Sequence, residues 1–248
     1  MRLKNKVAIV TGAAQGIGRA IALGMAREGA KIVVADLQAA KAKSVAEEAQ
    51  ALGVEALSVE VDVSNEPSVK TLAEQGLGRF GRVDILVNDA GIYRQSSVAE
   101  MAEEEWDRVI DVNLGGNFLC CRAFVPSMRA RKSGRIISIA SGIAHTGAVS
   151  GAHYAASKAG IVGFIKALAR ELGPDGITVN AICPSIIDTA LPRGHRSEAE
   201  LRERLMHNPL GHVMQPEDLV GAVLFLASAA AGYITGQAVN VNCGTVMI

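Results

Sequence analysis

The chain alternates short apolar runs with longer segments in which apolar residues recur every three to four positions. The short runs are rich in β-branched residues, and several are apolar throughout, which is typical of strands buried on both faces of a sheet. The longer segments have the spacing of amphipathic helices. We predict strands at 7–11, 32–36, 57–61, 85–88, 135–139, 178–182 and 238–241. We predict helices at 17–28, 38–51, 66–78, 103–131, 155–172 and 216–228.

This alternation predicts an α/β fold of the Rossmann type: a doubly wound, mostly seven-stranded parallel sheet with helices on both faces. No low-complexity linker or break in composition interrupts the pattern, so we expect residues 1–248 to form a single domain. One segment, 184–215, departs from it and contains Pro184, Pro192 and Pro209. Because this segment follows the carboxyl end of a predicted strand, where such sheets bind ligands, we expect a substrate lid rather than a surface loop without function.

Composition excludes several classes of protein. Hydrophobic residues make up 49% of the chain and charged residues 20%, which predicts a large buried core. The formal net charge of zero argues against a nucleic-acid partner and tolerates self-association. No run reaches the roughly 18 apolar residues of a membrane span, and the N-terminal apolar run at 7–10 is too short for a signal peptide. The four cysteines lack metal-ligand spacing, so we expect no metal and a cytoplasmic location.

Residues 11–18 (TGAAQGIG) form a glycine-rich loop between the first predicted strand and helix. Gly12 permits a tight exit from the strand, Gly16 lets a pyrophosphate approach the backbone, and Gly18 allows the helix to pack closely. The helix N-terminus then offers free N–H groups and a positive dipole end to phosphates. The loop therefore predicts a dinucleotide site rather than a simple turn.

Asp36, at the end of the second predicted strand, indicates which dinucleotide is bound. Its carboxylate could accept hydrogen bonds from both ribose hydroxyls and would repel a 2′-phosphate. The next residues are Leu37 and Gln38, not arginine. We therefore predict NAD rather than NADP. Asp62, after the third strand, could address the adenine amino group or could form a turn toward Ser64.

Tyr154 and Lys158 lie four residues apart, so on a helix they share one face. A free phenol has a pKa of about 10, and this must fall by roughly three pH units, about 4 kcal/mol, for the phenol to act as a base near pH 7. The Lys158 ammonium and an oxidised nicotinamide ring could supply much of this stabilisation. The pair therefore predicts acid/base chemistry, although its spacing alone is common on helix surfaces.

Two polar residues between these motifs complete a candidate catalytic set. Ser141 follows the fifth predicted strand and could hold a substrate oxygen against Tyr154. Asn113 lies inside the predicted helix 103–131, although asparagine is a poor helix former. It indicates either a local bend or a bound water that feeds a proton relay.

One further motif, NDAG at 88–91, follows the fourth predicted strand. With the glycine loop, Asn113, Ser141 and YAASK at 154–158, it resembles the short-chain dehydrogenase/reductase family, in its classical branch. The resemblance covers essentially the whole chain, and the motifs stand in the family's order. It implies NAD(P)-dependent interconversion of an alcohol and a carbonyl group.

The resemblance also implies a role for each matching residue. Tyr154 would be the general acid/base, Ser141 would position the substrate oxygen, and Asn113 would hold the relay water. Lys158 would bind the nicotinamide ribose and lower the pKa of the tyrosine. A homotetramer is implied as well, packed through the helix that carries Tyr154; Gly160 and Gly163 would permit close packing there or against the chain's own sheet. The expected cofactor contacts are Gly12, Gln15, Gly16, Ile17, Gly18, Asp36, Leu37, Asp62, Val63, Asn88, Ala90, Gly91, Tyr154, Lys158, Pro184, Ile187 and Thr189.

Three positions depart from the family's usual motifs. Asp89 replaces asparagine in NNAG, Ser185 replaces the glycine after Pro184, and VNCG at 241–244 replaces VDGG. None of them removes a residue of the catalytic set, so the departures leave the chemistry in place and the substrate class open.

The residues expected to wall the substrate pocket are mostly small and apolar, which suits an uncharged, moderately apolar ketone or secondary alcohol. We expect His145 and His153 to be structural or to face the rim, although His153 stays a candidate contact; the candidate substrate contacts are Tyr93, Ser141, Ile143, His153 and Ile186. The sequence thus favours NAD-dependent hydride transfer between a secondary alcohol and a ketone. A 3-oxoacyl-[acyl-carrier-protein]-type reductase is the alternative, and Arg193 and Arg196 in the lid leave room for such an acidic or carrier-bound substrate. A non-catalytic NAD-binding regulator is a remote third.

Overall fold

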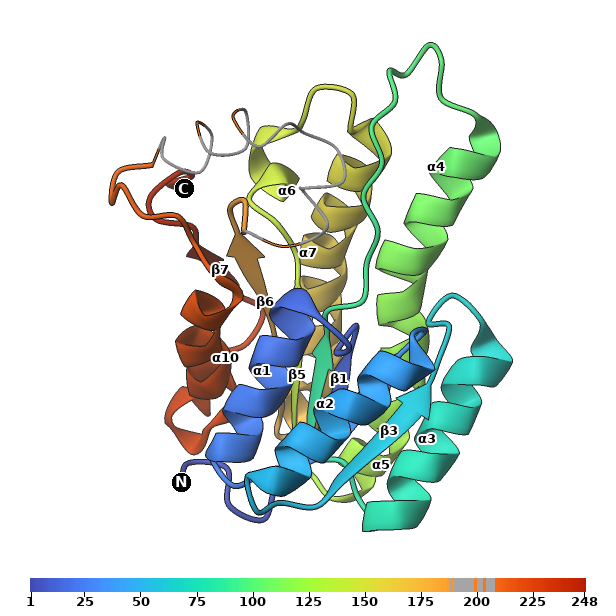
Figure 1. The fold of residues 1–248 in the computed structure, drawn as a ribbon, viewed down its shortest axis with the longest axis vertical. Coiled ribbons are helices and arrows are strands. Elements are labelled where there is room, and N and C mark those ends of the chain that lie inside the picture. The colour runs from blue at the N-terminus through green and yellow to red at the C-terminus, as the bar shows by residue number, and fades with distance from the viewer. Residues whose placement is uncertain (188, 190–198, 200–202, 204–207) are drawn as a thin grey trace.

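The computed structural model describes residues 1–187, 189, 199, 203 and 208–248. Within these residues, seven parallel strands form one sheet in the order β3-β2-β1-β4-β5-β6-β7 (Figure 1). The predicted doubly wound parallel sheet is confirmed. The strands are β1 (Val7–Thr11), β2 (Lys31–Asp36), β3 (Ala56–Glu60), β4 (Ile85–Asn88), β5 (Gly134–Ile139), β6 (Ile177–Pro184) and β7 (Ala238–Val241).

The predicted helices are all present, with small shifts at their ends. The long predicted helix 103–131 is interrupted by a π-helical turn at Asp111–Gly115. The last predicted helix begins with a 3₁₀ turn at Pro216–Leu219. The α-helices among the described residues are α1 (Gly16–Arg27), α2 (Ala39–Ala51), α3 (Glu66–Phe80), α4 (Glu103–Ile110), α5 (Gly116–Ala130), α6 (Ile143–Thr146), α7 (Ala152–Leu172) and α10 (Val220–Ala227).

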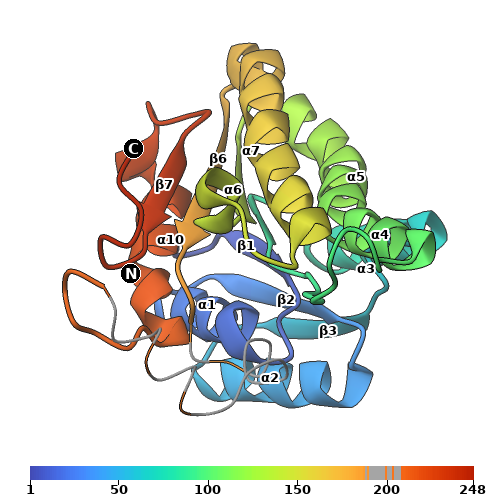
Figure 2. The same cartoon turned by 90° about the horizontal axis from the view of Figure 1, so that it is seen from above.

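The core forms two apolar layers, one on each face of the sheet. One layer packs α1, α2 and α10 against the strands, and the other packs α3, α5 and α7 (Figure 2). The strands supply mostly valine and isoleucine to both layers, and β1, β4 and β6 are buried along their whole length. Burial on both faces explains why these strands are continuous apolar runs rather than alternating patterns.

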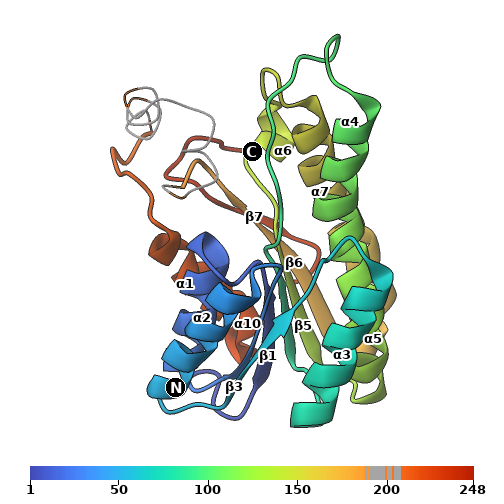
Figure 3. The same cartoon turned by 45° about the vertical axis from the view of Figure 1, so that its right-hand side comes forward.

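The strand order reverses between β1 and β4, which lie side by side with Thr11 paired to Asn88. In sheets of this kind the crevice at the carboxyl ends beside such a reversal is the usual ligand site. The Thr11 hydroxyl oxygen accepts the backbone N–H groups of Asp89 and Ala90 at 3.2 and 3.3 Å, which ties the two strand ends together. Above them lie α6 and the start of α7 (Figure 3).

In the described part of the chain, no helix is long and apolar enough to cross a membrane. The same residues contain no group of three or more His, Cys, Asp or Glu side chains arranged to hold a metal ion. Pro192, Arg193 and Arg196 of the expected lid lie outside the described residues.

Candidate active site

A cavity of about 1380 Å³ lies along the carboxyl ends of the strands. Ligand pockets usually measure roughly 300–1,000 Å³, so this one has room for a dinucleotide and a second small molecule. Most residues that the sequence singled out line it together. They are Gly12, Gln15, Gly16, Ile17, Asp36, Leu37, Asp62, Val63, Ala90, Gly91, Tyr93, Ser141, Ile143, Tyr154, Lys158, Pro184, Ile186, Ile187 and Thr189.

The glycine loop has the geometry of a phosphate cradle. Gly12 and Gly16 have φ values of +68° and +56°, which favour glycine. A Cβ atom on Gly18 would lie 2.3 Å from the carbonyl oxygen of Gly12, so only glycine lets α1 begin this close to the strand exit. The N-cap residue Gln15 makes no side-chain cap, and the first turn of α1 holds no acidic residue. The loop therefore fits an anionic group at the helix N-terminus.

Asp36 braces this loop from the end of β2. Its Oδ2 atom accepts the backbone N–H of Ala14 at 2.9 Å, and its Oδ1 atom accepts that of Gln38 at 2.9 Å. The side chain is buried but lines the cavity. Each carboxylate oxygen has a second lone pair, so the pair can still accept hydroxyl groups from a ligand.

Asp62 forms the turn that the sequence offered as an alternative, and it also lines the cavity. Its Oδ1 atom accepts the backbone N–H and the hydroxyl of Ser64 at 2.9 and 2.6 Å. Arg108 lies 3.6 Å from the other carboxylate oxygen. The Ser64 hydroxyl, aided by Arg108, holds the pKa of Asp62 below its usual value despite partial burial. Asp62 is therefore a fixed negative charge at this end of the cavity.

Helix α7 presents Tyr154 and Lys158 to the cavity from successive turns. The Lys158 Nζ atom donates to the carbonyl oxygen of Ile139 at 2.7 Å and lies 5.6 Å from the centre of the Tyr154 ring. The Tyr93 ring packs edge-on against Tyr154, with 4.9 Å between ring centres. Ser141, after β5, is hydrogen-bonded to Tyr154. The spacing in the sequence thus corresponds to a compact polar cluster on one wall.

Burial dominates the acid/base properties of this cluster. Burial raises the pKa of the Tyr154 phenol; the hydrogen bond from Ser141 acts to lower it, and the nearby Asp89 carboxylate raises it further. Burial also lowers the pKa of Lys158, while Asp89 acts against that shift. Tyr154 is therefore a proton donor here, and the lowered pKa of the phenol that the sequence led us to expect is not seen.

Asn113 lies in the π-helical turn, so the local bend that its position suggested is present. Its Oδ1 atom accepts the Ile92 N–H at 2.8 Å, and its Nδ2 atom donates to the Ile92 carbonyl at 3.0 Å and to the Ser157 hydroxyl at 3.1 Å. The Asn113 carbonyl accepts Nδ2 of Asn117 at 2.8 Å. The amide clamps the loop after β4 to α7. A relay water at Asn113 stays a prediction.

Comparison with known proteins identifies the family. The family model described as enoyl-(acyl carrier protein) reductase matches residues 12–246. The chain is 44% identical over 247 residues to a 3-oxoacyl-[acyl-carrier-protein] reductase of Synechocystis sp., covering 99% of this chain and 98% of that protein. The chain belongs to the short-chain dehydrogenase/reductase family.

Two further proteins are similar to the chain, one in sequence and one in structure. The chain is 39% identical over 244 residues to (2S)-[(R)-hydroxy(phenyl)methyl]succinyl-CoA dehydrogenase subunit BbsD of Thauera aromatica, covering 98% of this chain and 97% of that protein. The crystal structure of gox2181 superposes with a TM-score of 0.94 at 39% identity, covering 98% of this chain and 96% of that one. At about 40% identity, one relative is thus named a reductase and another a dehydrogenase.

Four of the predicted site residues lie behind the cavity wall of this short-chain dehydrogenase/reductase. Gly18 and Asn113 support the wall as described above, and Asn88 is buried, with its Nδ2 atom 3.5 Å from Sγ of Cys121. His153 is buried with Nε2 3.3 Å from Glu105 Oε1 on α4. The candidate substrate contact at His153 is wrong in this structure, because the ring faces α4; the structural role also considered fits it.

Several cavity residues escaped the sequence reasoning. Asp89 lines the cavity, and its carboxylate accepts the backbone N–H of Gly18. The sequence showed that Asp89 replaces the asparagine of NNAG, but it did not show that the carboxylate points into the cavity. Thr245 and Val246 also line the cavity. The rule that ligands bind at carboxyl ends of strands could have found them, since both follow β7.

Proposed function

We propose that this protein is an NAD-dependent oxidoreductase that interconverts a secondary alcohol and a ketone by hydride transfer. One observation carries the proposal: Ser141, Tyr154 and Lys158 meet on a single wall of the cavity whose other end holds the glycine loop and Asp36. Hydride transfer between an alcohol and a ketone needs a group that exchanges a proton with the substrate oxygen and a site that holds the dinucleotide beside it. This cavity combines both.

The described residues fit NAD. Gly12, Gly16 and the uncapped start of α1 would hold its phosphates, and Asp36 would accept its adenosine ribose hydroxyls. A 2′-phosphate would face the Asp36 carboxylate, and Leu37 beside it is 60% exposed and uncharged. Bound NAD would supply the hydride acceptor for oxidation or, when reduced, the hydride for reduction.

The chain's own residues would handle the proton. Ser141 would hold the substrate oxygen, and the protonated phenol of Tyr154 would donate to a ketone oxygen as it becomes an alcohol. In the oxidation direction Tyr154 must give up its proton first, so its pKa must come to lie roughly three pH units below the ordinary value of about 10, a difference of about 4 kcal/mol. The ammonium of Lys158, 5.6 Å from the phenol ring centre, favours the phenolate. Lys158 would also bind the ribose next to the nicotinamide.

A specific substrate class deserves testing within this proposal, because the named relatives act on acyl thioesters. The cavity lining includes the apolar side chains of Ile143, Val149 and Ile186 and the polar side chain of Gln95. Pro184–Ile187 and Gln215, at the two ends of the proposed lid, line the cavity too. We therefore propose 3-hydroxyacyl and 3-oxoacyl thioesters as the leading substrate class, with free ketones as the alternative.

A panel of substrates with both cofactors tests the proposal. Acetoacetyl-CoA, a simple aromatic ketone and a 2-enoyl-CoA are each assayed with NADH and NADPH, and the matching alcohols with NAD and NADP. We expect turnover of a ketone–alcohol pair with NAD(H), and no reduction of the enoyl thioester. Enoyl reduction alone would contradict the assignment to carbonyl chemistry. Binding of NADH without turnover of any member would favour the non-catalytic regulator.

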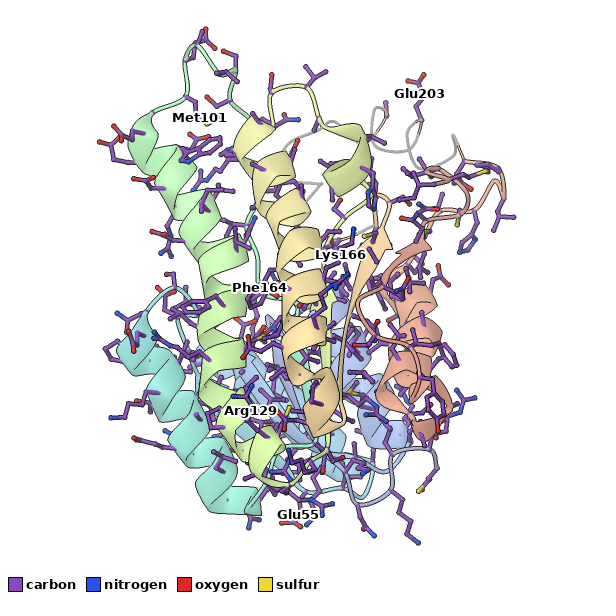
Figure 4. All side chains as sticks on the ribbon, turned by 180° about the vertical axis from the view of Figure 1, so that it is seen from behind. Glu55, Met101, Arg129, Phe164, Lys166 and Glu203 are labelled. Carbon is purple, nitrogen blue, oxygen red and sulfur yellow. The ribbon has the colours of Figure 1, made fainter. Side chains whose placement is uncertain are left out.

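We also propose a homotetramer of single-domain subunits in the cytoplasm. Gly163 on α7 has open space where a Cβ atom would stand, whereas a Cβ on Gly160 would lie 2.8 Å from Leu114 of the same chain. Gly163 could therefore pack against a helix of another subunit, whereas Gly160 packs against its own chain. Phe164 and the 45% exposed Phe118 lie beside it on α7 and α5, which form the face seen in Figure 4. All four cysteines are free, as expected in a reducing compartment.

A further inference from the structure

Asp89 occupies a central place between the strands that form the site. The last residue of β4, Asn88, is paired with Thr11 of β1 and with Ser138 of β5. Asp89 is the next residue, so its backbone lies between the ends of both neighbouring strands, beside Ile139. Its N–H donates to the Thr11 hydroxyl at 3.2 Å, which fixes the residue in this position.

The side chain of Asp89 points to the first turn of α1. Its carboxylate accepts the Gly18 N–H, and a Cβ atom added to Gly18 would lie only 2.8 Å from Oδ2 of Asp89. Asparagine, the family's usual residue here, could accept the same hydrogen bond through its amide oxygen. The hydrogen bond therefore does not explain a charged residue at this position.

Lys158 reaches the same place from α7. The carbonyl that anchors its Nζ atom at 2.7 Å belongs to Ile139, which follows Ser138 on β5 as Asp89 follows Asn88 on β4. Adjacent parallel strands lie about 4.8 Å apart, so the Nζ atom of Lys158 is held at the end of the strand next to the one that carries Asp89. Lys158 is 4% exposed and Asp89 is half-buried in the lining of the same cavity, so the ammonium is largely withdrawn from water and a nearby charge acts on it more strongly than in solution.

The other titratable groups near this pair come from β2, the loop after β4, α7 and β6. Asp36 acts on Asp89 as a second negative charge. Tyr154 feels the Asp89 charge, and Tyr93 lies against its ring. The Cys183 thiol of β6 faces Lys158. Among these groups, Lys158 is the single one that is positively charged, and Asp89 is the carboxylate that acts on it.

We propose that Asp89 is a positioning residue whose carboxylate keeps Lys158 in its ammonium form and so sets the pH range in which Tyr154 can exchange its proton. The kinetic part of this inference rests on the proposed function, whereas the effect on Lys158 itself does not. Burial lowers the pKa of Lys158 and raises that of Asp89, and the attraction between the two charged forms opposes both shifts.

The sign of the effect follows from the charge that is removed. In an Asp89→Asn variant the ammonium loses its negative neighbour, so the pKa of Lys158 falls further below its ordinary value. The phenolate of Tyr154 loses a repulsive neighbour, so the pKa of Tyr154 falls as well. The hydrogen bond from Gly18 is retained, so a purely structural role would leave both pKa values in place.

The direct test is an NMR titration of Lys158 in cofactor-free protein labelled with [¹³C]lysine, with the Lys158 signal assigned from a Lys158→Arg variant. We expect the Lys158 midpoint to fall by about one pH unit in Asp89→Asn, as for a lysine that loses a close opposite charge. Asp84→Asn is the matched control, because Asp84 also accepts a backbone N–H, from Val7 at 2.9 Å, but lies before β4 at its other end. It should leave the midpoint unchanged.

A midpoint in Asp89→Asn that stays in place or rises would overturn the inference. Asp89→Ser provides a second neutral variant in case Asp89→Asn does not fold, and it should shift the midpoint in the same direction. In kinetics, both limbs of the pH profile of kcat/KM should move to lower pH in Asp89→Asn. An active variant with unmoved limbs counts against this inference alone, whereas a wild-type protein inactive on all substrates counts against the proposed function.

Discussion

At the scale of single residues, Asp36 combines a structural task with a task in ligand binding. Its two carboxylate oxygens accept the Ala14 and Gln38 N–H groups and so hold the glycine loop against the end of β2. The same carboxylate lines the cavity where the adenosine ribose of NAD would lie. Because its negative charge would repel the 2′-phosphate of NADP, Asp36 is the residue from which we expect a preference for NAD.

Replacing Asp36 with asparagine should relax that preference. The repulsion between a carboxylate and a 2′-phosphate is worth about 1–4 kcal/mol at close range, so the ratio of kcat/KM for NAD over NADP should fall by roughly tenfold or more. Steady-state kinetics with both cofactors measures the ratio. Asp62→Asn is the control, since Asp62 lies after a different strand, and it should leave the ratio unchanged. A wild-type preference for NADP would contradict the account of Asp36.

Single residues also show what the sequence could and could not reveal. The positions of Tyr154 and Lys158 followed from helical periodicity, because both belong to one helix. Asn113 and His153 act through partners 21 and 48 residues away, at Ile92 and Glu105, and no local pattern encodes such contacts. The charge of Asp89 was visible in the sequence, but its neighbour Lys158 follows only from the order of the strands.

At the scale of elements, the junction of β1 and α1 depends on how closely the two can approach. Gly18 lies on the buried side of α1, against the carbonyl of Gly12 and the carboxylate of Asp89. This contact fixes where the helix N-terminus points and therefore where a pyrophosphate would bind.

Gly18→Ala should consequently destabilise the protein by roughly 1–3 kcal/mol and weaken NADH binding, because its Cβ would overlap backbone atoms that cannot move aside. Gly78→Ala in α3 is the matched control: Gly78 is an exposed helical glycine with nothing within 4 Å of its would-be Cβ. It should stabilise the protein by about 0.4–1 kcal/mol and leave NADH binding unchanged. Urea unfolding and NADH fluorescence titration give both quantities; equal effects of the two substitutions would refute the explanation.

The elements themselves were largely predictable, since strands buried on both faces and amphipathic helices have distinct periodicities. The interruption of the predicted helix 103–131 was indicated only by Asn113, and its π-helical form was not. The turn makes tertiary contacts, such as those of Asn113 with Ile92 and Ser157, and Gly116, the residue after it, packs so closely on Val63 that an added Cβ would lie 2.8 Å from Cγ2. Periodicity alone does not contain those contacts.

At the scale of the whole molecule, the exposed face of α5 and α7 bears on the proposed assembly. Phe118 and Phe164 make an edge-on contact there with 6.5 Å between ring centres, beside the open position at Gly163. Aromatic side chains beside a small residue on a helix face favour close packing with another helix.

Light scattering coupled to size exclusion should give a mass about four times the 25.9 kDa of the chain. Gly163→Arg should lower that mass, because a long charged side chain would enter the helix contact. Gly78→Arg, an equally open position on α3, should not. A monomeric wild-type protein would contradict the proposed tetramer but not the proposed chemistry.

The central claim is that Tyr154 exchanges a proton with the substrate oxygen. Its most direct test is the rate of ketone reduction and alcohol oxidation by a Tyr154→Phe variant. The substitution removes the hydroxyl but keeps a ring to pack against Tyr93. Loss of a general acid/base predicts a fall in kcat of about 10²–10⁴-fold. The Kd for NADH should stay within about twofold of wild type, because uniform binding is retained. A Tyr154→Phe enzyme that keeps the wild-type kcat would contradict the central claim.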